Sequence, residues 1–518
     1  MRDAAASSGD RLLTGALLAS MVLHGLAMLS MAAFLLPALP GGGGASDTVR
    51  VGYIAAHPWL FRLGWLPWQL CALADLAQAL GMWRARWIPR LGAALVLALT
   101  VAAVLPDQSG QGLWITRGVE LAQAAASTGD LGEYLRFEQH VFALTAGWGA
   151  VLYTLGGLGW TWCFVQAGTW TRALSVLSWI LWPVMVGVAV SPLLPETLRP
   201  SPLIVAAGNA LGFVLLLAWL ALLTELVLRR SQPFAAHGCA AGFHHPRGGV
   251  LGWAADVVAN SRLLRALTEP LPVLAMVSDI TDVIYVNYIV PVDRLLPLVP
   301  EGLQLQRLGT DGAYGLFTFL TFRHGHFGFR FLGPLRRLLP SPIQSNWRIH
   351  VRDPRTGVSG IYFVTNATTS TLHALAARLL TQGLPLHVLH TAELTRSGDG
   401  QVRLWLDPGT GSAPDALATL QPAPAPELPP LFAACFASFA EFLAYCVPQN
   451  HSLSTQPHRQ TVTRHEIDLG IQLSACEPLT GEVDGRAVNR IAGDSAPLCF
   501  RVPSVRFHFA RELRDPLS

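Results

Sequence analysis

The stretch that decides the fold of the C-terminal half reads VIYVNYIVPVDRLLPLVPEGLQLQ and spans residues 283–306. Its first eight residues, 283–290, are mostly β-branched and aromatic, and this composition predicts a strand. Prolines interrupt the remainder. The periodicity of the chain therefore changes after Pro270, from long apolar runs to short strands separated by turns.

Further strands and turns extend from this stretch toward the C-terminus. Strands are predicted at 313–322, 347–351, 360–366, 386–395, 402–407, 460–473 and 504–510, and helices at 372–381 and 432–447. Turn sequences at 309–312 (GTDG), 353–357 (DPRTG) and 397–400 separate the strands, and the Pro/Ala-rich residues 414–430 are expected to form an exposed loop. Residues 270–518 are thus predicted to form an α+β domain around a curved sheet or barrel, large enough to fold alone.

The first 230 residues have a different composition. Hydrophobic residues make up 51% of the chain and charged residues only 13%, about half the roughly 25% typical of soluble domains. Six segments approach the roughly 20 apolar residues needed to cross a bilayer. They are residues 12–36, 59–80, 88–105, 141–165, 173–194 and 203–228. The expected architecture is an all-α membrane bundle of about six spans, of which the second is the weakest.

The arginines outside these segments predict an orientation. One side carries Arg2, Arg11, Arg84, Arg86, Arg90, Arg172, Arg229, Arg230 and Arg247, and the other carries Arg50, Arg117, Arg136 and Arg199. The arginine-rich side is expected to be cytoplasmic. Both termini and the soluble domain are therefore predicted to lie in the cytoplasm, and the protein is predicted to be a multi-pass protein of a bacterial inner membrane.

Arg62 and Asp75 are charged residues inside the second predicted span. As intramembrane charges they could mark a transport pathway. At 100° per residue they do not share a helix face, and Arg62 lies near the end of its span, so a structural role is favoured.

Residues 231–269 are interpreted as a linker followed by a juxtamembrane helix. The linker is rich in Gly, Pro and His, and its three histidines, His237, His244 and His245, lack a spacing that favours a metal. Residues 256–267 resemble a short amphipathic helix. Arg262 and Arg265 on this helix would favour anionic membrane lipid.

Several classes of chemistry are excluded by composition. All 36 basic residues are Arg, so a Walker A motif, which needs Lys, is absent. Seven scattered cysteines without a C-x-x-C pair argue against a disulfide framework or a zinc ribbon. No cofactor and no metal is predicted. The net charge of +3, without an arginine-rich tail, gives no reason to expect a nucleic-acid partner.

The C-terminal half resembles the YqjF-like domain of unknown function. The resemblance rests on residues 283–306, on NWRIHV at 346–351, on GIYFVTNA at 360–367, and on FAEFLAY at 439–445 followed by 464–467. It covers roughly residues 278–510. The family is similar to the acetoacetate decarboxylase-like fold, so the resemblance implies a cone-shaped barrel that encloses a pocket.

The resemblance implies that decarboxylation in that fold requires a Lys that forms a Schiff base with the substrate. This chain has no Lys. Arg cannot replace it, because a guanidinium stays protonated. The chain also has Gln344 where the family pattern has a Glu. Catalytic residues therefore remain unknown, and whether the protein is an enzyme is left open.

Asn346, Arg348 and His350 alternate and so share one face of a predicted strand. They are candidate ligand-binding residues inside a cavity, with Arg348 holding a carboxylate and Tyr362 adding a hydroxyl. The alternatives are that this face is exposed to solvent, or that Arg348 forms a buried structural ion pair.

Several histidines and serines are further candidates for functional sites. His324 and His326 could ligate a metal, but a polar loop is favoured because no third ligand is identifiable. His451, His458 and His465 recur every seven residues in a turn-rich region, where this spacing has no geometric meaning. Ser452 and Ser454 lie near a histidine, but the chain lacks a G-x-S-x-G motif that would indicate acyl transfer.

The leading functional hypothesis is a cytoplasmic domain that binds a small, partly apolar ligand, which can be acidic. The first alternative is a membrane-anchored enzyme without Schiff-base chemistry. The second is a transport or sensory module that the soluble domain regulates.

Overall fold

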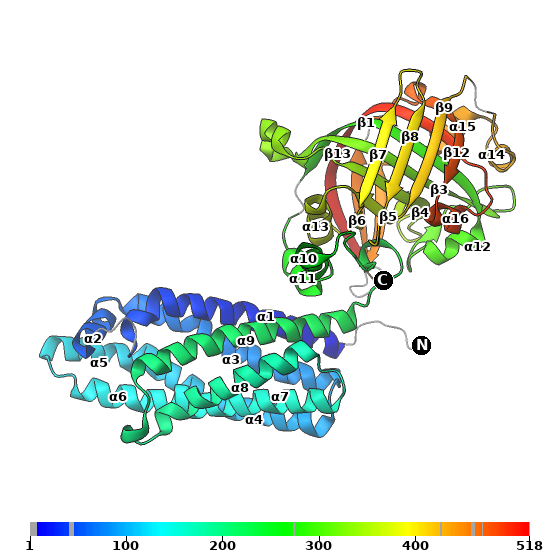
Figure 1. The fold of residues 1–518 in the computed structure, drawn as a ribbon. Coiled ribbons are helices and arrows are strands. Elements are labelled where there is room, and N and C mark those ends of the chain that lie inside the picture. Colours follow the sequence, from blue (N-terminus) through cyan, green and yellow to red (C-terminus); the bar gives the residue numbers. More distant parts are fainter. Residues whose placement is uncertain are drawn as a thin grey trace. The chain divides into compact units, whose positions relative to one another are not determined.

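The computed structural model describes residues 8–40, 46–272, 275–424, 427–456, 461–468 and 470–516. The chain divides into two compact units, of which one ends at Ser231 and the other begins at Gln232. Figure 1 colours both along the sequence. The predicted domain boundary at residue 230 lies next to this division.

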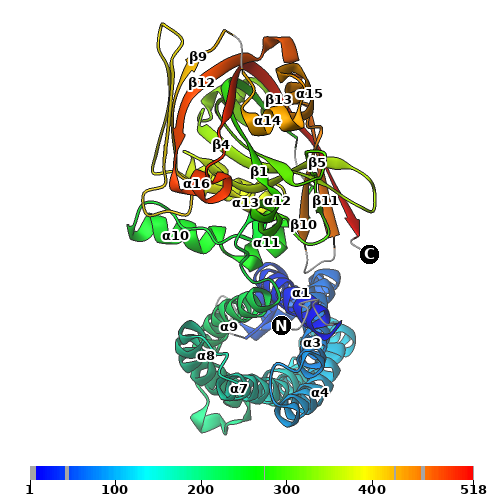
Figure 2. The ribbon, with the colours of Figure 1, turned by 90° about the vertical axis from the view of Figure 1, so that its right-hand side faces the viewer.

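The first unit is entirely helical. Its described α-helices are α1 (Ser8–Ser30), α2 (Asp47–Ala56), α3 (Pro58–Ala85), α4 (Arg90–Leu113), α5 (Val119–Thr128), α6 (Gly132–Phe142), α7 (Ala150–Gln166), α8 (Arg172–Val190) and α9 (Pro202–Ser231). The six longest form a closed ring, in which α1, α3, α4, α7, α8 and α9 contact one another in that order and α9 returns to α1 (Figure 2).

Five helical stretches are long and apolar enough to cross a membrane. They are Gly9–Ala38, Arg90–Thr128, Gly132–Gln166, Arg172–Leu193 and Pro202–Ser231. Five of the six predicted spans are thus confirmed as apolar helices of sufficient length. The second predicted span is helix α3, which lies in the ring but is not among the five, so the six-span topology stays a prediction.

The short helices α2, α5 and α6 share a core with one end of the ring. A buried ion pair joins two of them, because Arg50 on α2 donates to both carboxylate oxygens of Glu138 on α6 at 2.9 and 3.0 Å. Arg50 also donates to the Ala38 carbonyl at 3.0 Å. These bonds satisfy a guanidinium that is only 2% exposed, as a buried charge requires.

The second unit combines one large sheet with short helices. The strands are β1 (Met276–Pro291), β2 (Gln304–Leu305), β3 (Tyr314–Phe329), β4 (Ile343–Arg352), β5 (Ser359–Thr368), β6 (Leu386–Val388), β7 (Thr391–Arg396), β8 (Val402–Asp407), β9 (Ala416–Pro422), β10 (His451–Gln456), β11 (Thr461–Asp468), β12 (Glu477–Asp484) and β13 (Leu498–Pro516). The α-helices are α10 (Gly249–Ala259), α11 (Arg262–Thr268), α12 (Val292–Leu295), α13 (Thr371–Leu380), α14 (Pro430–Cys435), α15 (Phe439–Cys446) and α16 (Arg486–Ala492).

Seven strands close into a barrel. The order is β1-β3-β4-β5-β10-β11-β13, and β13 pairs again with β1 from Met276 to Asn287. Strands β5 and β10 are joined by a single parallel bridge, Ser452 to Ile361. The sheet continues from β13 through β12, β9 and β8 to β7. The predicted α+β domain with a curved sheet is therefore confirmed.

Strand β1 is buried on both faces, which explains its nearly continuous apolar sequence. Val286 and Tyr288 on one face join a core formed with β3, β4 and the strands β7 to β9. Tyr285 and Ile289 on the other face join a core formed with α14, α15 and β13. The one polar interruption, Asn287, donates to the Leu498 carbonyl at 2.9 Å and accepts from Thr318 at 2.8 Å.

Two predictions for this unit are wrong. The expected loop 414–430 contains strand β9, whose alternate residues Ala416, Ala418 and Leu420 are buried against the sheet. The expected helix 432–447 is two helices, α14 and α15, and Ser438 caps the second by accepting a hydrogen bond from the Glu441 amide. The alternation of buried and exposed residues in ALATLQP was not recognised in the sequence, because prolines surround this stretch.

The segment interpreted as a linker is part of the second unit. Phe243, Ala255 and Ala259 pack into a core with strands β5 and β6 and helix α13. Arg262 is only 5% exposed and donates to the Gln232 carbonyl at 3.1 Å, so it is buried in the protein instead of presented to lipid. The single amphipathic helix expected at 256–267 is interrupted between α10 and α11.

This packing predicts where a stable C-terminal fragment must begin. A fragment of residues 232–518 should fold, whereas residues 270–518 should be less stable by about 3 kcal/mol or more, because removing Phe243 and its neighbours uncovers apolar side chains of β5. Thermal unfolding and limited proteolysis of the two fragments measure the difference. Equal stability of the two fragments would show that the packing of α10 and α11 contributes little.

Candidate functional site

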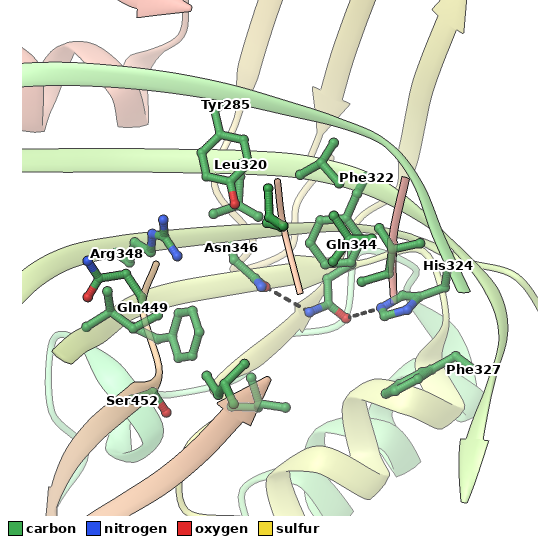
Figure 3. Close-up of a pocket in the computed structure, with 18 residues that line it drawn as sticks. Tyr285, Leu320, Phe322, His324, Phe327, Gln344, Asn346, Arg348, Gln449 and Ser452 are labelled. Carbon is green, nitrogen blue, oxygen red and sulfur yellow. Dashed lines mark hydrogen bonds between the residues drawn. The ribbon is translucent and has the colours of Figure 1, made fainter. Parts of the chain in front are cut away.

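A pocket lies inside the second unit and is lined by residues of strands β1, β3, β4, β5, β10, β11 and β13 (Figure 3). Eleven of its lining residues are apolar: Ile280, Val283, Leu320, Phe322, Phe327, Ile361, Phe363, Leu384, Ile467, Ile471 and Val505. Seven are polar: Tyr285, His324, Gln344, Asn346, Arg348, Gln449 and Ser452. The volume open to the centres of water-sized spheres is about 60 Å³. One water needs roughly 10–15 Å³ on this measure, so the pocket suits a small ligand.

Arg348 supplies the positive charge of the pocket. It lies in the middle of β4 and is only 3% exposed. One guanidinium nitrogen, Nη2, donates to the Cys446 carbonyl at 3.1 Å, and Nε has no hydrogen-bond partner. Among the described residues, no Asp or Glu forms an ion pair with it. Burying a charge without a counterion is costly, so this guanidinium is available to an anion.

Tyr285 lies beside this guanidinium, whose Cζ is 5.5 Å from the centre of the tyrosine ring. Burial raises the pKa of Tyr285 to about 12, although the positive charge of Arg348 opposes the shift. The phenol is therefore neutral at physiological pH. Arg348 thus faces an aromatic ring and a hydroxyl group, and neither neutralises its charge.

A chain of hydrogen bonds connects the polar side chains of β4 to His324 on β3. Gln344 donates through Nε2 to Asn346 Oδ1 at 2.8 Å, and its Oε1 lies 3.0 Å from His324 Nε2 (Figure 3). His324 Nδ1 lies 2.8 Å from the Ser278 hydroxyl. Burial lowers the pKa of His324 to about 4, although the hydrogen bond that Gln344 Oε1 accepts opposes this shift, so the ring is neutral. This network orients Asn346 and leaves its NH₂ group as a donor.

Of the four predicted ligand-binding residues, the structure places Asn346 and Arg348 in the pocket and two elsewhere. His350 is fully buried and stacks on Tyr445 with ring centres 4.9 Å apart, outside the pocket. Burial and the charge of Arg348 lower the pKa of His350, so it is neutral. Tyr362 lies in the core on the other face of β5, because Ile361 and Phe363 occupy the pocket face.

Sequence reasoning missed several residues of the pocket. Gln344 shares a strand face with Asn346 and Arg348, and the alternation of β4 could have shown it. His324 was expected in a loop, whereas β3 continues through it to Phe329. Ser452 and Gln449 follow a helix about a hundred residues further along, and no local pattern links them to β4.

Ser452 begins a buried polar row across three strands. Its Oγ lies 3.3 Å from His465 Nδ1, and His465 Nε2 lies 3.0 Å from Glu512 Oε2. The three residues are direct cross-strand neighbours on β10, β11 and β13. Burial tends to raise the pKa of Glu512, but hydrogen bonds with His465 and Arg514 and the charge of Arg514 outweigh it and lower that pKa to about 2.

Among the described residues, no three His, Cys, Asp or Glu side chains gather in a way that could hold a metal ion. His326 is exposed on β3, and His451 lies at the start of β10. His458 lies outside the described residues. The seven-residue spacing of His451, His458 and His465 therefore has no structural interpretation. His465 contacts Ser452.

The strands that carry Arg348 and its neighbours also carry a family signature. Residues 278–443 match the DUF2071 family. This YqjF-like family is described as an uncharacterized conserved protein, and the match covers the strands β1 to β9 and most of the pocket. No curated protein matches the chain.

Solved structures similar to the C-terminal unit include an acetoacetate decarboxylase and an acetoacetate decarboxylase-like enzyme. One is acetoacetate decarboxylase from Legionella pneumophila, with 11% identity, a TM-score of 0.34, and coverage of 46% of this chain and 86% of that chain. Another is an acetoacetate decarboxylase-like enzyme from Sphingomonas wittichii RW1, with 10% identity, a TM-score of 0.34, and coverage of 48% and 94%. A third is the enduracididine biosynthesis enzyme MppR complexed with pyruvate, with 14% identity, a TM-score of 0.32, and coverage of 48% and 91%.

Proposed function

We propose that the DUF2071 domain binds a small carboxylate in its pocket. The observation that carries this proposal is Arg348, a guanidinium that is 97% buried, lines the cavity and has no carboxylate partner among the described residues. The apolar walls formed by residues such as Leu320 and Phe322 favour a ligand with a short hydrocarbon or aromatic part. Asn346 and Tyr285 are placed to add neutral hydrogen bonds.

Matched pairs of acids and amides test this proposal. Full-length protein in nanodiscs should bind butyrate and benzoate more tightly than butyramide and benzamide, by about tenfold or more, since only the acids pair with Arg348. Isothermal titration calorimetry at constant ionic strength measures each affinity. Equal affinities for acid and amide would contradict a carboxylate site, and so would binding of neither member of any pair.

We also propose that the protein lies in a bacterial inner membrane. Both termini and the DUF2071 domain would then lie in the cytoplasm. Five apolar helices of spanning length and the arginine asymmetry support it. A green fluorescent protein fused after Arg230 should fluoresce, and alkaline phosphatase fused there should stay inactive. An active phosphatase at this position would contradict the cytoplasmic placement.

A second candidate function is hydrolysis of a small carboxylate ester in the same pocket, and the row Ser452–His465–Glu512 favours it. Nε2–H of His465 donates to Glu512, so Nδ1 can accept the Ser452 proton. Ser452 Oγ would attack the ester carbonyl as its proton passes to His465. The alcohol would leave with that proton, and water would then hydrolyse the acyl-enzyme to the acid and restore Ser452.

Covalent labelling distinguishes hydrolysis from binding alone. A fluorophosphonate probe should label Ser452 in the full-length protein, and Ser452→Ala should remove at least nine-tenths of the label. Ser454→Ala is a matched control on the same strand, because the Ser454 hydroxyl is buried without a hydrogen-bond partner. Absence of label in the wild-type protein, or label that survives Ser452→Ala, would leave the domain as a binding module.

A further inference from the structure

A second pocket lies inside the ring of helices of the first unit. Residues from all six ring helices line it, and the volume open to the centres of water-sized spheres is about 90 Å³. Figure 2 views the ring end-on, with α1, α3 and α4 facing α7, α8 and α9. Its polar lining includes His24 from α1, Asp75 and Gln78 from α3, Thr100 from α4 and Tyr153 from α7.

Asp75 supplies a negative charge that no hydrogen-bonded cation neutralises. Its Oδ1 accepts from the Ser20 hydroxyl at 2.8 Å, whereas His24 Nε2 lies 3.7 Å from Oδ2. His24 Nδ1 lies 2.8 Å from the Ser20 carbonyl, which can only accept, so Nδ1 carries the proton. His24 is thus hydrogen-bonded through Nδ1 to its own helix, and its Nε2 lies beyond hydrogen-bond distance of the Asp75 carboxylate.

Two further oxygens lie in the pocket wall. Gln78 Oε1 is buried without a hydrogen-bond partner, and the Tyr153 hydroxyl interacts with the carboxylate of Asp107. Both can accept, and no Arg is among the lining residues. Together with Asp75 they make the wall rich in acceptors, which disfavours an anion and favours a cation.

The remaining wall is aromatic. Trp160, Trp182 and Trp219 line the pocket. The indole N–H groups of Trp182 and Trp219 donate to Thr161 and Ser178, each at 3.0 Å. The N–H groups of these two indoles are thus already hydrogen-bonded to side chains of the helices. Indole faces attract ammonium groups by about 0.5–2 kcal/mol each when water is excluded.

We propose that this pocket binds a small organic ammonium ion, with Asp75 as counterion and the three tryptophans as its aromatic walls. A metal ion would need several oxygen ligands in close contact, whereas this pocket offers one carboxylate and apolar aromatic surface. The site is separate from the pocket around Arg348 and takes a ligand of opposite charge. A role in transport or sensing, with the helical unit as the cation-binding part, would follow from it.

Choline and its uncharged isostere 3,3-dimethylbutan-1-ol test the proposal. Full-length protein in phosphatidylcholine nanodiscs should bind choline at least about tenfold more tightly than the isostere, because only choline pairs with Asp75. Asp75→Asn should remove this preference. Glu225→Gln is the matched control, since Glu225 pairs with Arg229 at 2.6 Å and does not line the pocket.

The outcomes separate this proposal from the others. Arg348→Met should leave choline binding unchanged. If Asp75→Asn does not fold, Gln78→Leu replaces it, because Gln78 Oε1 makes no internal bond and its loss should weaken choline, but not the isostere, by about threefold or more. Absence of choline binding, equal binding of the isostere, or choline binding that survives these pocket variants would overturn the proposal.

Discussion

Replacing Arg348 by Met is expected to abolish carboxylate binding, with a loss of about a hundredfold to a thousandfold in affinity. Hydrogen bonds to charged groups contribute about 1.5–3 kcal/mol each, and a bidentate pair makes two of them. The melting temperature should stay unchanged or rise, because Met fills the space of the arginine stem and removes a buried charge without a counterion. Calorimetry with benzoate, together with thermal unfolding, measures both effects.

Two variants make this result specific to the guanidinium. Arg352→Met removes an exposed arginine from the end of the same strand and should leave benzoate binding intact. Arg348→Lys keeps the charge but loses the planar fork, so it should recover only part of the affinity. A strong destabilisation by Arg348→Met would mean that its bond to the Cys446 carbonyl is structural and that the pocket charge serves folding.

Replacing Trp347 by Ala is expected to destabilise the C-terminal unit by about 3–5 kcal/mol. Trp347 is fully buried, and its ring stacks on Phe319 with centres 4.8 Å apart. Its indole N–H donates to Ser345 Oγ at 3.0 Å, and Ser345 Oγ also accepts from Thr321 at 2.9 Å, so the substitution leaves a cavity and removes one of these two hydrogen bonds. Hydrogen exchange of peptides from β3 and β4 in the full-length protein should rise accordingly.

Trp405 on β8 provides the matched control for this effect. It is 39% exposed, so Trp405→Ala should change stability by about 1 kcal/mol or less. Similar rates of hydrogen exchange in the Trp347→Ala and Trp405→Ala variants would show that the core between the barrel and the strands β7 to β9 is not the main source of stability.

Two of the four residues predicted for the candidate site lie in the pocket. Alternation along NWRIHV put Asn346 and Arg348 on one face, and the barrel turned that face toward the pocket. The same reasoning placed His350 there, but helix α15 covers it, and the stacked ring of Tyr445 excludes it from the pocket. Ser452 could not be linked to Arg348 from the sequence, because a single parallel bridge between β5 and β10 brings their strands into one barrel.

Local periodicity was enough to predict the long apolar helices before residue 230 and the strand at 283–290, and composition was enough to exclude Lys chemistry. The remaining features depend on long-range packing. Closure of β13 onto β1 joins residues more than two hundred positions apart, and the burial of Phe243 and Arg262 makes the presumed linker part of the domain. The physical reason is that hydrophobic periodicity reports which face of an element is buried, whereas the partner that buries it depends on long-range packing.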